Sequence, residues 1–309
     1  MKKEASPNRI SSKAWRCARG PVFRAAALII VFIFAAAVVD AIRCASGFIT
    51  VRYEVASPKI SAAMRFVMLT DLHAEEYGES NCELLDAVRA EEPDLIFVNG
   101  DMISAESSEE EVEIALSLIT ALTDIAPVYL SYGNHEEGYL SFNGPEILER
   151  YYETGAIVLD AAYKDIEVNG QFIRIGGTSD YCFNHYQLEK NYRLGRSYQF
   201  MSRFCNTDLF KLLLCHIPQN YYPHASDLRY EDWNCDLVLS GHTHGGLWRI
   251  PFIGAPYLPG QGFFPKLVHG EYDIGNAEMI IGAGLIRRDR VPRLNDPCEL
   301  VVITLVPGE

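Results

Sequence analysis

The sequence predicts an α/β fold, a four-layer α/β/β/α sandwich, preceded by one N-terminal transmembrane helix. Strand and helix patterns alternate over residues 64–152, and the later part of the chain is rich in strand patterns. A basic segment precedes an apolar run near the N-terminus, which is typical of a membrane anchor. Hydrophobic residues make up 49% and charged residues 22% of the 309 residues, the composition of a globular protein with a substantial core.

The N-terminal segment is expected to cross a membrane. Residues 1–24 carry seven bases and one acid, and residues 25–39 contain no charged or polar side chain. A helix over residues 22–42 would span a thin bilayer, with Arg24 extending to the interface. The basic end is expected to stay in the cytoplasm, so that a single-pass cell-membrane protein would have its catalytic domain outside. Secretion after signal cleavage near residues 39–41 is one alternative, and a buried core helix is another.

The net charge is distributed unevenly along the chain. The whole chain carries −14 at pH 7, the first 24 residues carry +6, and the remainder therefore carries −20. Nucleic-acid binding needs clustered Lys and Arg side chains, so no nucleic-acid binding is expected. The eight cysteines are scattered without a Cys-x-x-Cys pair and predict neither a disulfide framework nor a zinc finger. The sequence leaves the oligomeric state open.

The elements can be placed in order along the chain. The predicted regions are a basic cytoplasmic tail (1–21), a transmembrane signal-anchor (22–42), a connector (43–63) and the globular domain (64–309). Helices are predicted over residues 82–90, after a cap at Ser107 or Ser108, and over residues 144–152. The expected strands are residues 65–70, 94–99, 127–131, 156–159, 172–175, 211–215, 236–239, 278–281 and 300–305. A long surface loop or partial lid is expected at residues 176–196.

Metal-ligating side chains follow the predicted strands at the points where the strands end. They are Asp71, His73, Asp101, Asn134, His216, His242 and His244. Because strands of an open α/β sheet gather their carboxyl ends at one crevice, these side chains are expected to lie together. Mixed nitrogen and oxygen ligands suit first-row divalent ions. Seven ligands fit two ions that share a carboxylate and a bridging hydroxide, and such a positive site favours a phosphate ester as substrate.

The order of these motifs resembles a known family. Asp-x-His, Gly-Asp, Gly-Asn-His-Glu, a single His and Gly-His-x-His follow one another as in the calcineurin-like metallophosphoesterases, over about residues 65–305. Segments 245–252, 282–285 and 292–294 resemble the bacterial membrane-associated or exported phosphodiesterase branch. That branch usually has Gln where this chain has Leu247, which affects the expected substrate preference rather than metal binding.

The resemblance implies a role for each motif residue. Asp71, His73 and His244 would hold one divalent ion. Asn134, His216 and His242 would hold the other, and Asp101 would bridge the two. His135 would not bind metal and would protonate the leaving alkoxide or stabilise the transition state. The two ions would be manganese, iron or zinc, in a pair that varies within the family.

Two further residues have alternative interpretations. Arg249 is expected to clamp a substrate phosphate, a role that suits a planar guanidinium, or else to pair with surface acids. Glu136 is expected either to hydrogen-bond a ligand histidine or to cap the helical turn that follows it.

The predicted function is metal-dependent hydrolysis of phosphoester bonds. Phosphodiesters are favoured, and the expected membrane position suggests a lipid- or envelope-linked substrate. A non-catalytic, metal-dependent surface binding module is one alternative. A two-metal amidohydrolase is another, although such enzymes usually begin with His-x-His on the first strand and use a bridging lysine, whereas this chain begins with Asp71-x-His73.

Overall fold

Two six-stranded sheets form the centre of the protein, whose computed structural model describes residues 12–178, 196–221, 233–287, 289 and 291–308. The first sheet has the order β1 (Phe48–Ser57), β14 (Cys298–Pro307), β2 (Met64–Leu69), β3 (Leu95–Asn99), β4 (Val128–Ser131) and β5 (Ile157–Val158). The second has the order β12 (Gly270–Ile274), β13 (Ala277–Ile281), β9 (Leu237–Ser240), β8 (Phe210–Leu214), β7 (Gln171–Gly177) and β6 (Ala162–Val168). Strands β2 to β5 run parallel, and so do β13, β9, β8 and β7, which aligns the carboxyl ends within each sheet.

The sheets pack face to face because the side chains of each strand alternate between two apolar layers. In β2, Phe66 and Met68 belong to the buried layer between the sheets, together with Leu212 of the second sheet. Val67 and Leu69 belong to a separate buried layer on the other face of the first sheet. The alternating side chains of β2 therefore pack into both apolar layers, one on each face of the first sheet.

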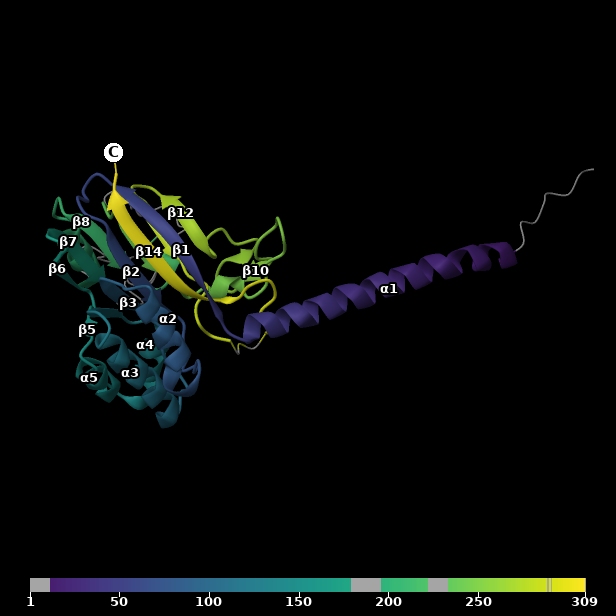
Figure 1. Cartoon of the computed structure of the whole chain (residues 1–309), viewed down its shortest axis with the longest axis horizontal. Helices are drawn as coiled ribbons and strands as arrows, with labels where there is room; N and C mark the ends of the chain where they lie inside the picture. The colour runs from purple at the N-terminus through teal and green to yellow at the C-terminus, as the bar shows by residue number, and fades with distance from the viewer. Residues whose placement is uncertain (1–11, 179–195, 222–232, 288, 290, 309) are drawn as a thin grey trace, which may run out of the picture.

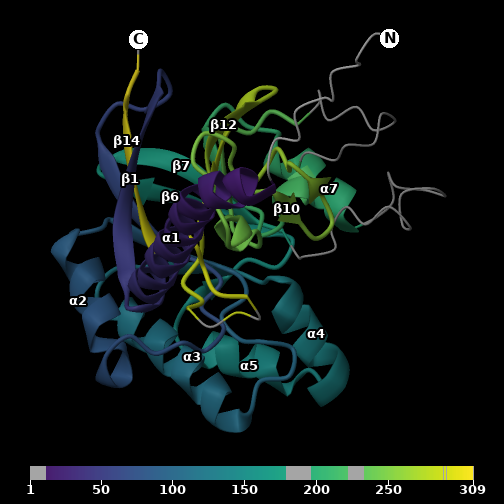
Figure 2. The ribbon, with the colours of Figure 1, turned by 90° about the vertical axis from the view of Figure 1, so that its right-hand side faces the viewer.

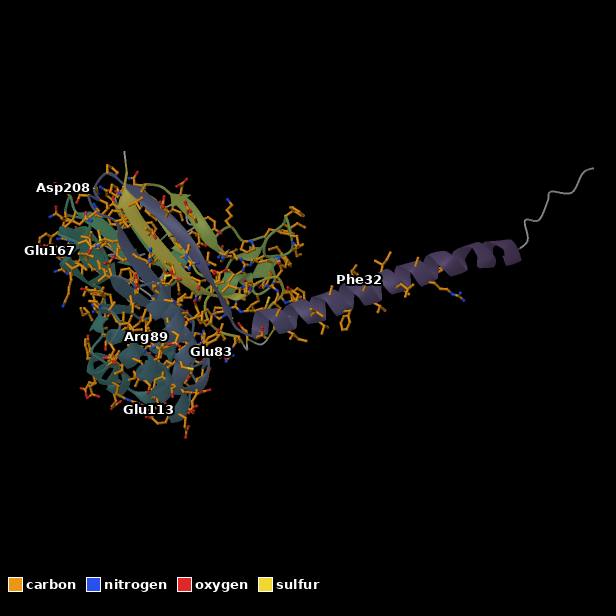
Figure 3. The ribbon with its side chains drawn as sticks, in the orientation of Figure 1. Phe32, Glu83, Arg89, Glu113, Glu167 and Asp208 are labelled. Atoms are coloured by element: carbon orange, nitrogen blue, oxygen red, sulfur yellow. The ribbon has the colours of Figure 1, made fainter. Side chains whose placement is uncertain are left out.

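Helices cover the outer faces of both sheets. Helices α2 (Cys82–Ala90), α3 (Glu109–Thr123) and α5 (Glu146–Glu153) pack on the first sheet, and their exposed side chains include Glu83, Arg89 and Glu113 (Figures 1 and 3). Helix α7 (Arg196–Phe204) packs on the second sheet through Phe200 and Phe204. The predicted α/β/β/α sandwich is thus confirmed.

Helix α1 (Ser12–Ala45) extends away from the domain as a single long rod (Figures 1 and 2). Its segment Phe23–Ala45 is predominantly apolar and mostly exposed, although Cys44 near its end is buried, and Phe32 in its middle is exposed (Figure 3). These 23 residues are about 35 Å long at 1.5 Å per residue, enough to cross a hydrocarbon core of about 30 Å. The helix continues beyond the predicted end at residue 42, and the predicted N-terminal apolar helix is confirmed.

Several elements differ from the sequence-based expectation. The predicted connector 43–63 contains β1, which pairs in parallel with β14 from Phe48 to Ser57 and so belongs to the first sheet. The edge strands β6 and β12 were not expected; both lie in hairpins and are only partly buried, so their apolar pattern is weak. Of the predicted loop at residues 176–196, the part from 179 to 195 lies outside the described residues.

The predicted helix caps can also be compared with the structure. Of the two serines considered, Ser108 caps α3: its hydroxyl accepts from Glu111 N, and the Glu111 carboxylate accepts from Ser108 N at 2.8 Å. Helix α4 (Asn134–Asn143) was not expected, since its first residues form the Gly-Asn-His-Glu motif. The remaining short elements are α8 (Pro218–Tyr221), the 3₁₀ turns η1 (Glu79–Asn81) and η4 (His244–Gly246), and the hairpin β10 (Tyr257–Leu258) with β11 (Gly262–Phe263).

Candidate metal centre

The seven predicted ligands lie at the carboxyl ends of five strands from both sheets. Asp71 and His73 follow β2, Asp101 follows β3, Asn134 follows β4, His216 follows β8, and His242 and His244 follow β9. Backbone and side-chain bonds join the turns that carry them. Asp71 N donates to the carbonyl oxygen of Gly100 at 3.0 Å, and His242 N of the second sheet donates to the Asp71 carboxylate at 2.9 Å. The site is therefore formed where the two sheets meet.

The ligand atoms fall into two groups with one residue in common. Asp71, His73, Asp101 and His244 form the first group, and Asp101, His216 and His242 form the second, with ligand atoms in each group within 4.8 Å of one another. His216 Nε2 lies 3.0 Å from Asp101 Oδ2, and His244 Nε2 lies 3.3 Å from Asp71 Oδ1. Two neighbouring ions that share the Asp101 carboxylate fit this arrangement.

Two buried polar atoms at the site support the fit to metal ions. His73 Nε2 and Asn134 Oδ1 are buried and have no hydrogen-bond partner among the described residues. Buried polar atoms are normally paired, because an unpaired one costs about 1–3 kcal/mol. Both atoms are metal-ligating types, so an ion at the site would satisfy them.

Three of the ligand histidines are oriented through their other ring nitrogen. His73 Nδ1 bonds Ser104 Oγ at 2.9 Å, and His216 Nδ1 bonds the carbonyl oxygen of Asn99 at 2.7 Å. His244 Nδ1 lies 2.9 Å from the carboxylate of Asp289. Such contacts fix the ring and leave Nε2 as the ligand atom. Sequence reasoning missed these partners.

The backbone at the site adopts an uncommon conformation. Five ligands have a positive φ between 47° and 66°, namely Asp71, His73, Asp101, His242 and His244. Each such residue costs about 1–3 kcal/mol and persists only where its surroundings enforce it. Gly100, with φ of 80°, allows close packing of two turns: a Cβ there would lie 2.6 Å from Gly133 N. Strain is thus concentrated in the turns that direct the ligands.

The charges at the site shift the pKa of several ligands. Burial lowers the pKa of His73 to about 4, and burial together with nearby His216 does the same for His242. Burial alone would raise the pKa of Asp71, but His216 and His244 lower it to about 2. Burial alone would lower the pKa of His244, but hydrogen bonds to Asp289 and Asp71 raise it to about 9. At neutral pH the metal-free site therefore holds ionised carboxylates with neutral His73 and His242, whereas His244 is protonated and must release its proton to an ion.

His135 lies next to the ligands, and its ring has a defined hydrogen-bond partner. Its backbone N donates to Asp101 Oδ1 at 2.8 Å, and its ring centroid lies 4.6 Å from that of His73. Ala105 N donates to His135 Nδ1 at 3.1 Å, so the neutral ring carries its proton on Nε2. His135 can therefore donate a hydrogen bond from Nε2 to an oxygen at the site.

Glu136 is buried and holds backbone amides rather than a ligand histidine. Its carboxylate accepts from the N–H groups of Asp101 and Gly133, both at 2.8 Å, and of Met102 at 2.7 Å. Tyr151 also donates to it, at 3.2 Å. Neither expectation described this role fully: Glu136 bonds the residue that precedes α4, as a cap would, and it also holds the turn that carries Asp101.

Arg249 lies in a separate ion-pair network. Its guanidinium lies 2.7 Å from Asp296 and 3.5 Å from Glu299, both of which are buried. His269, which pairs with Glu299 at 2.8 Å, also contacts Arg249. This arrangement favours the alternative interpretation, an ion pair, although the acids are buried rather than on the surface.

Arg293 is also buried, and its guanidinium donates to the carbonyl oxygen of His244 at 3.2 Å.

Comparison with known proteins identifies relatives that match most of the chain. Residues 64–246 match the family model of the calcineurin-like phosphoesterases. The chain is 28% identical over 258 residues to an uncharacterized metallophosphoesterase of Campylobacter jejuni, covering 82% of this chain and 62% of that protein, less than two thirds of its length. It is 26% identical over 246 residues to the uncharacterized metallophosphoesterase YkuE of Bacillus subtilis, covering 78% of each. It is also 26% identical over 221 residues to the phosphodiesterase YaeI of Escherichia coli, covering 70% of this chain and 74% of that protein. The predicted resemblance to the superfamily is confirmed, and the bacterial relatives are consistent with the predicted branch.

Proposed function

The chain belongs to the calcineurin-like phosphoesterase family, whose members are metal-dependent phosphoester hydrolases, and we propose that it is a membrane-anchored phosphodiesterase with two divalent ions. The observation that supports this most strongly is the position of Asp101, which belongs to both groups of ligand atoms. A carboxylate shared by two neighbouring ions is what a binuclear centre requires.

The ligands divide between the two ions. Asp71, His73 and His244 hold one ion, in agreement with the first group of ligand atoms. His216 and His242 hold the other, with Asn134 supplying its buried Oδ1. Asp101 would be shared by the two ions, for which this donor set suits manganese, iron or zinc.

The residues of the chain then act on a phosphodiester as follows. The ions, when bound, provide a nucleophile from water at neutral pH and offset negative charge on the phosphate. An oxygen of water forms a bond to phosphorus while the bond from phosphorus to the leaving alcohol breaks. His135 donates a hydrogen bond from Nε2 to the departing oxygen, and the alkoxide takes up the proton that the attacking water releases. Glu136 keeps the turns that carry Asp101 and His135 in register.

The membrane position suggests where the substrate is found. The exposed apolar segment Phe23–Ala45 anchors the protein in the cell membrane as a single-pass helix, with the basic N-terminal residues in the cytoplasm and the domain outside. Secretion after signal cleavage is the alternative. A tethered domain meets phosphodiesters of lipids or the cell envelope first, and the relative YaeI is named a phosphodiesterase.

A metal-reconstitution panel tests the proposal. The chelator-treated full-length protein is loaded with Mn²⁺, Fe²⁺ or Zn²⁺ and assayed on an aryl phosphodiester and on the matching monoester. Turnover of the diester with two ions per chain is expected, and Asp101→Asn should abolish it. Full inertness with both ions bound would favour a binding module, whereas hydrolysis of amides but not phosphoesters would favour an amidohydrolase.

A further inference from the structure

An apolar cleft opens directly beside the candidate metal centre. Its volume is about 630 Å³, in the range of roughly 300–1,000 Å³ typical of small-molecule sites. Its polar lining consists of His242, Thr243, His244 and the carboxylate-bearing Asp289. The rest of its lining is largely apolar and includes Leu247, Trp248, Tyr257 and Val291. A ligand with its phosphate at the two histidines would therefore have its other end among hydrocarbon and aromatic side chains.

The segment that forms one wall of this cleft also has an exposed apolar surface. Residues 250–264, which include the β10–β11 hairpin, contain no charged residue, in a domain that is otherwise strongly acidic. Phe252 is completely exposed, and Phe263 and Phe264 are 79% and 65% exposed. Exposed apolar side chains gathered in one segment mark a surface that contacts a membrane or a partner. We call Phe252, Phe263 and Phe264 the aromatic rim.

A chain of contacts connects the cleft to the end of the membrane helix. Trp248 Nε1 donates to the carbonyl oxygen of Pro292 at 2.9 Å. Asn295 Nδ2 donates to the carbonyl oxygen of Arg249 at 3.0 Å, and Asn295 N donates to Asp40 near the end of α1. In Figure 1 the β10 region forms the end of the domain on the side toward which α1 extends. The bilayer that holds α1 therefore lies on the side of the aromatic rim.

The chemistry of the rim favours a bilayer as its occupant. Aromatic side chains are preferred at the interface between lipid and water. An uncharged surface also avoids the repulsion that the acidic remainder of the domain would meet at anionic lipid headgroups. Leu247, three residues after His244, extends the apolar lining close to the candidate metal centre.

On these observations, and resting on the proposed function, the geometry points to a phosphoester lipid as substrate, drawn from the bilayer that holds α1. Its hydrocarbon chain lies in the cleft and its phosphate at the metal centre, while the aromatic rim rests in the bilayer interface. The bond that breaks is the same phosphoester bond, and no further reactant is needed.

The first test uses alkyl phosphates as competitive inhibitors of aryl phosphodiester hydrolysis by the full-length protein in nanodiscs. Each CH₂ transferred from water to an apolar site strengthens binding about fourfold. Octyl phosphate should therefore inhibit at least about tenfold more strongly than methyl phosphate. The ratio of the inhibition constant of methyl phosphate to that of octyl phosphate measures this preference. Leu247→Gln and Tyr257→Asn should reduce the ratio at least about threefold, because they make the cleft polar without adding charge. Phe172 is an exposed residue on β7 and does not line the cleft, so Phe172→Asp should leave the ratio unchanged.

The outcomes separate this inference from the proposed function. A ratio near one in the unsubstituted protein, or a ratio that the cleft variants leave unchanged, would overturn the lipid inference while phosphodiesterase activity remained. Absence of all phosphoester hydrolysis with both ions bound would overturn the proposed function, and the lipid inference with it.

The second test measures the rim directly and does not depend on turnover. Phe252→Trp and Phe172→Trp are reconstituted separately in phosphatidylcholine vesicles whose acyl chains carry bromine, which quenches nearby tryptophan fluorescence. The fluorescence of the unsubstituted protein is subtracted to correct for the native tryptophans. The remaining fluorescence from the tryptophan at position 252 should be quenched, and that from position 172 should not. Equal and weak quenching at both positions would show that the rim does not contact the bilayer and would overturn this part of the inference.

Discussion

Glu136 accepts a hydrogen bond from the backbone N of Asp101 at 2.8 Å, although 35 positions separate the two residues. The same carboxylate accepts from Gly133 N, which directly precedes Asn134 and His135. One buried side chain therefore holds the turn after β3 against the turn after β4. The relative position of Asp101 and His135 depends on it.

Glu136→Gln is expected to destabilise the fold and to weaken metal binding. The amide would direct a donor toward N–H groups that now meet an acceptor, and buried unsatisfied groups cost about 1–3 kcal/mol. The free energy of unfolding in urea should fall by that amount in chelator-treated protein. Glu83→Gln, an exposed position on α2, should change it by less than about 0.5 kcal/mol. Equal effects of the two substitutions would contradict the role given to Glu136.

His135→Ala should lower kcat by about 10²–10⁴-fold while both ions stay bound. The ring is not among the grouped ligand atoms, and its Nε2–H can donate a hydrogen bond to the charge that develops on a leaving oxygen. The loss should be largest for an alkyl leaving group and small for a nitrophenyl one, whose own ring spreads the charge. Metal analysis of the purified variant provides the control, since loss of an ion would assign His135 to the ligands instead.

The sequence predicted that the seven candidate ligands lie near one another because each follows an apolar strand. The buried strands around Phe97 and Leu239 are recognisable from composition alone, and parallel strands bring their ends to one edge. The Ser108 cap was recognisable for the same reason, because it is a local pattern. Strand β1 was not, since it is an edge strand whose pairing with β14 joins residues far apart in the sequence.

Features that depend on tertiary contact could not be predicted. The positive φ of His242 and His244 has no signal in the residue types, because glycine is the usual marker of that conformation. Arg249 was expected either to clamp phosphate or to pair with surface acids, and its partner Asp296 could not be identified because it lies 47 positions away in the sequence. Asp289 lies 45 positions from His244 and belongs to no recognisable motif.

Asp289→Asn should weaken metal binding at the His244 position by about 10–100-fold. The carboxylate lies 2.9 Å from His244 Nδ1 and increases the basicity of the ring, which an amide does far less. Calorimetric titration of chelator-treated protein should therefore show one weakened ion and one ion bound as before. Asp86→Asn, an exposed position on α2, serves as the matched control. Equal weakening of both ions would point to general disruption of the site.

Metal affinity should rise with pH up to about 9, because an ion must displace a proton from His244. In the metal-free protein the bonds to Asp289 and Asp71 raise the pKa of His244 to about 9, so below that pH the ring is protonated. Burial lowers the pKa of His73 and of His242 to about 4, so these rings are already neutral above pH 5 and release no proton. One proton should thus be released for each ion bound at the His244 position. The affinity for this ion should then increase about tenfold per pH unit from pH 6 to 8 and level off above 9.

Asp289→Asn removes one of the two bonds that raise the pKa of His244, so the metal affinity of this variant should level off at a lower pH. A pH-independent affinity in the unsubstituted protein would show that His244 does not exchange a proton for a metal ion.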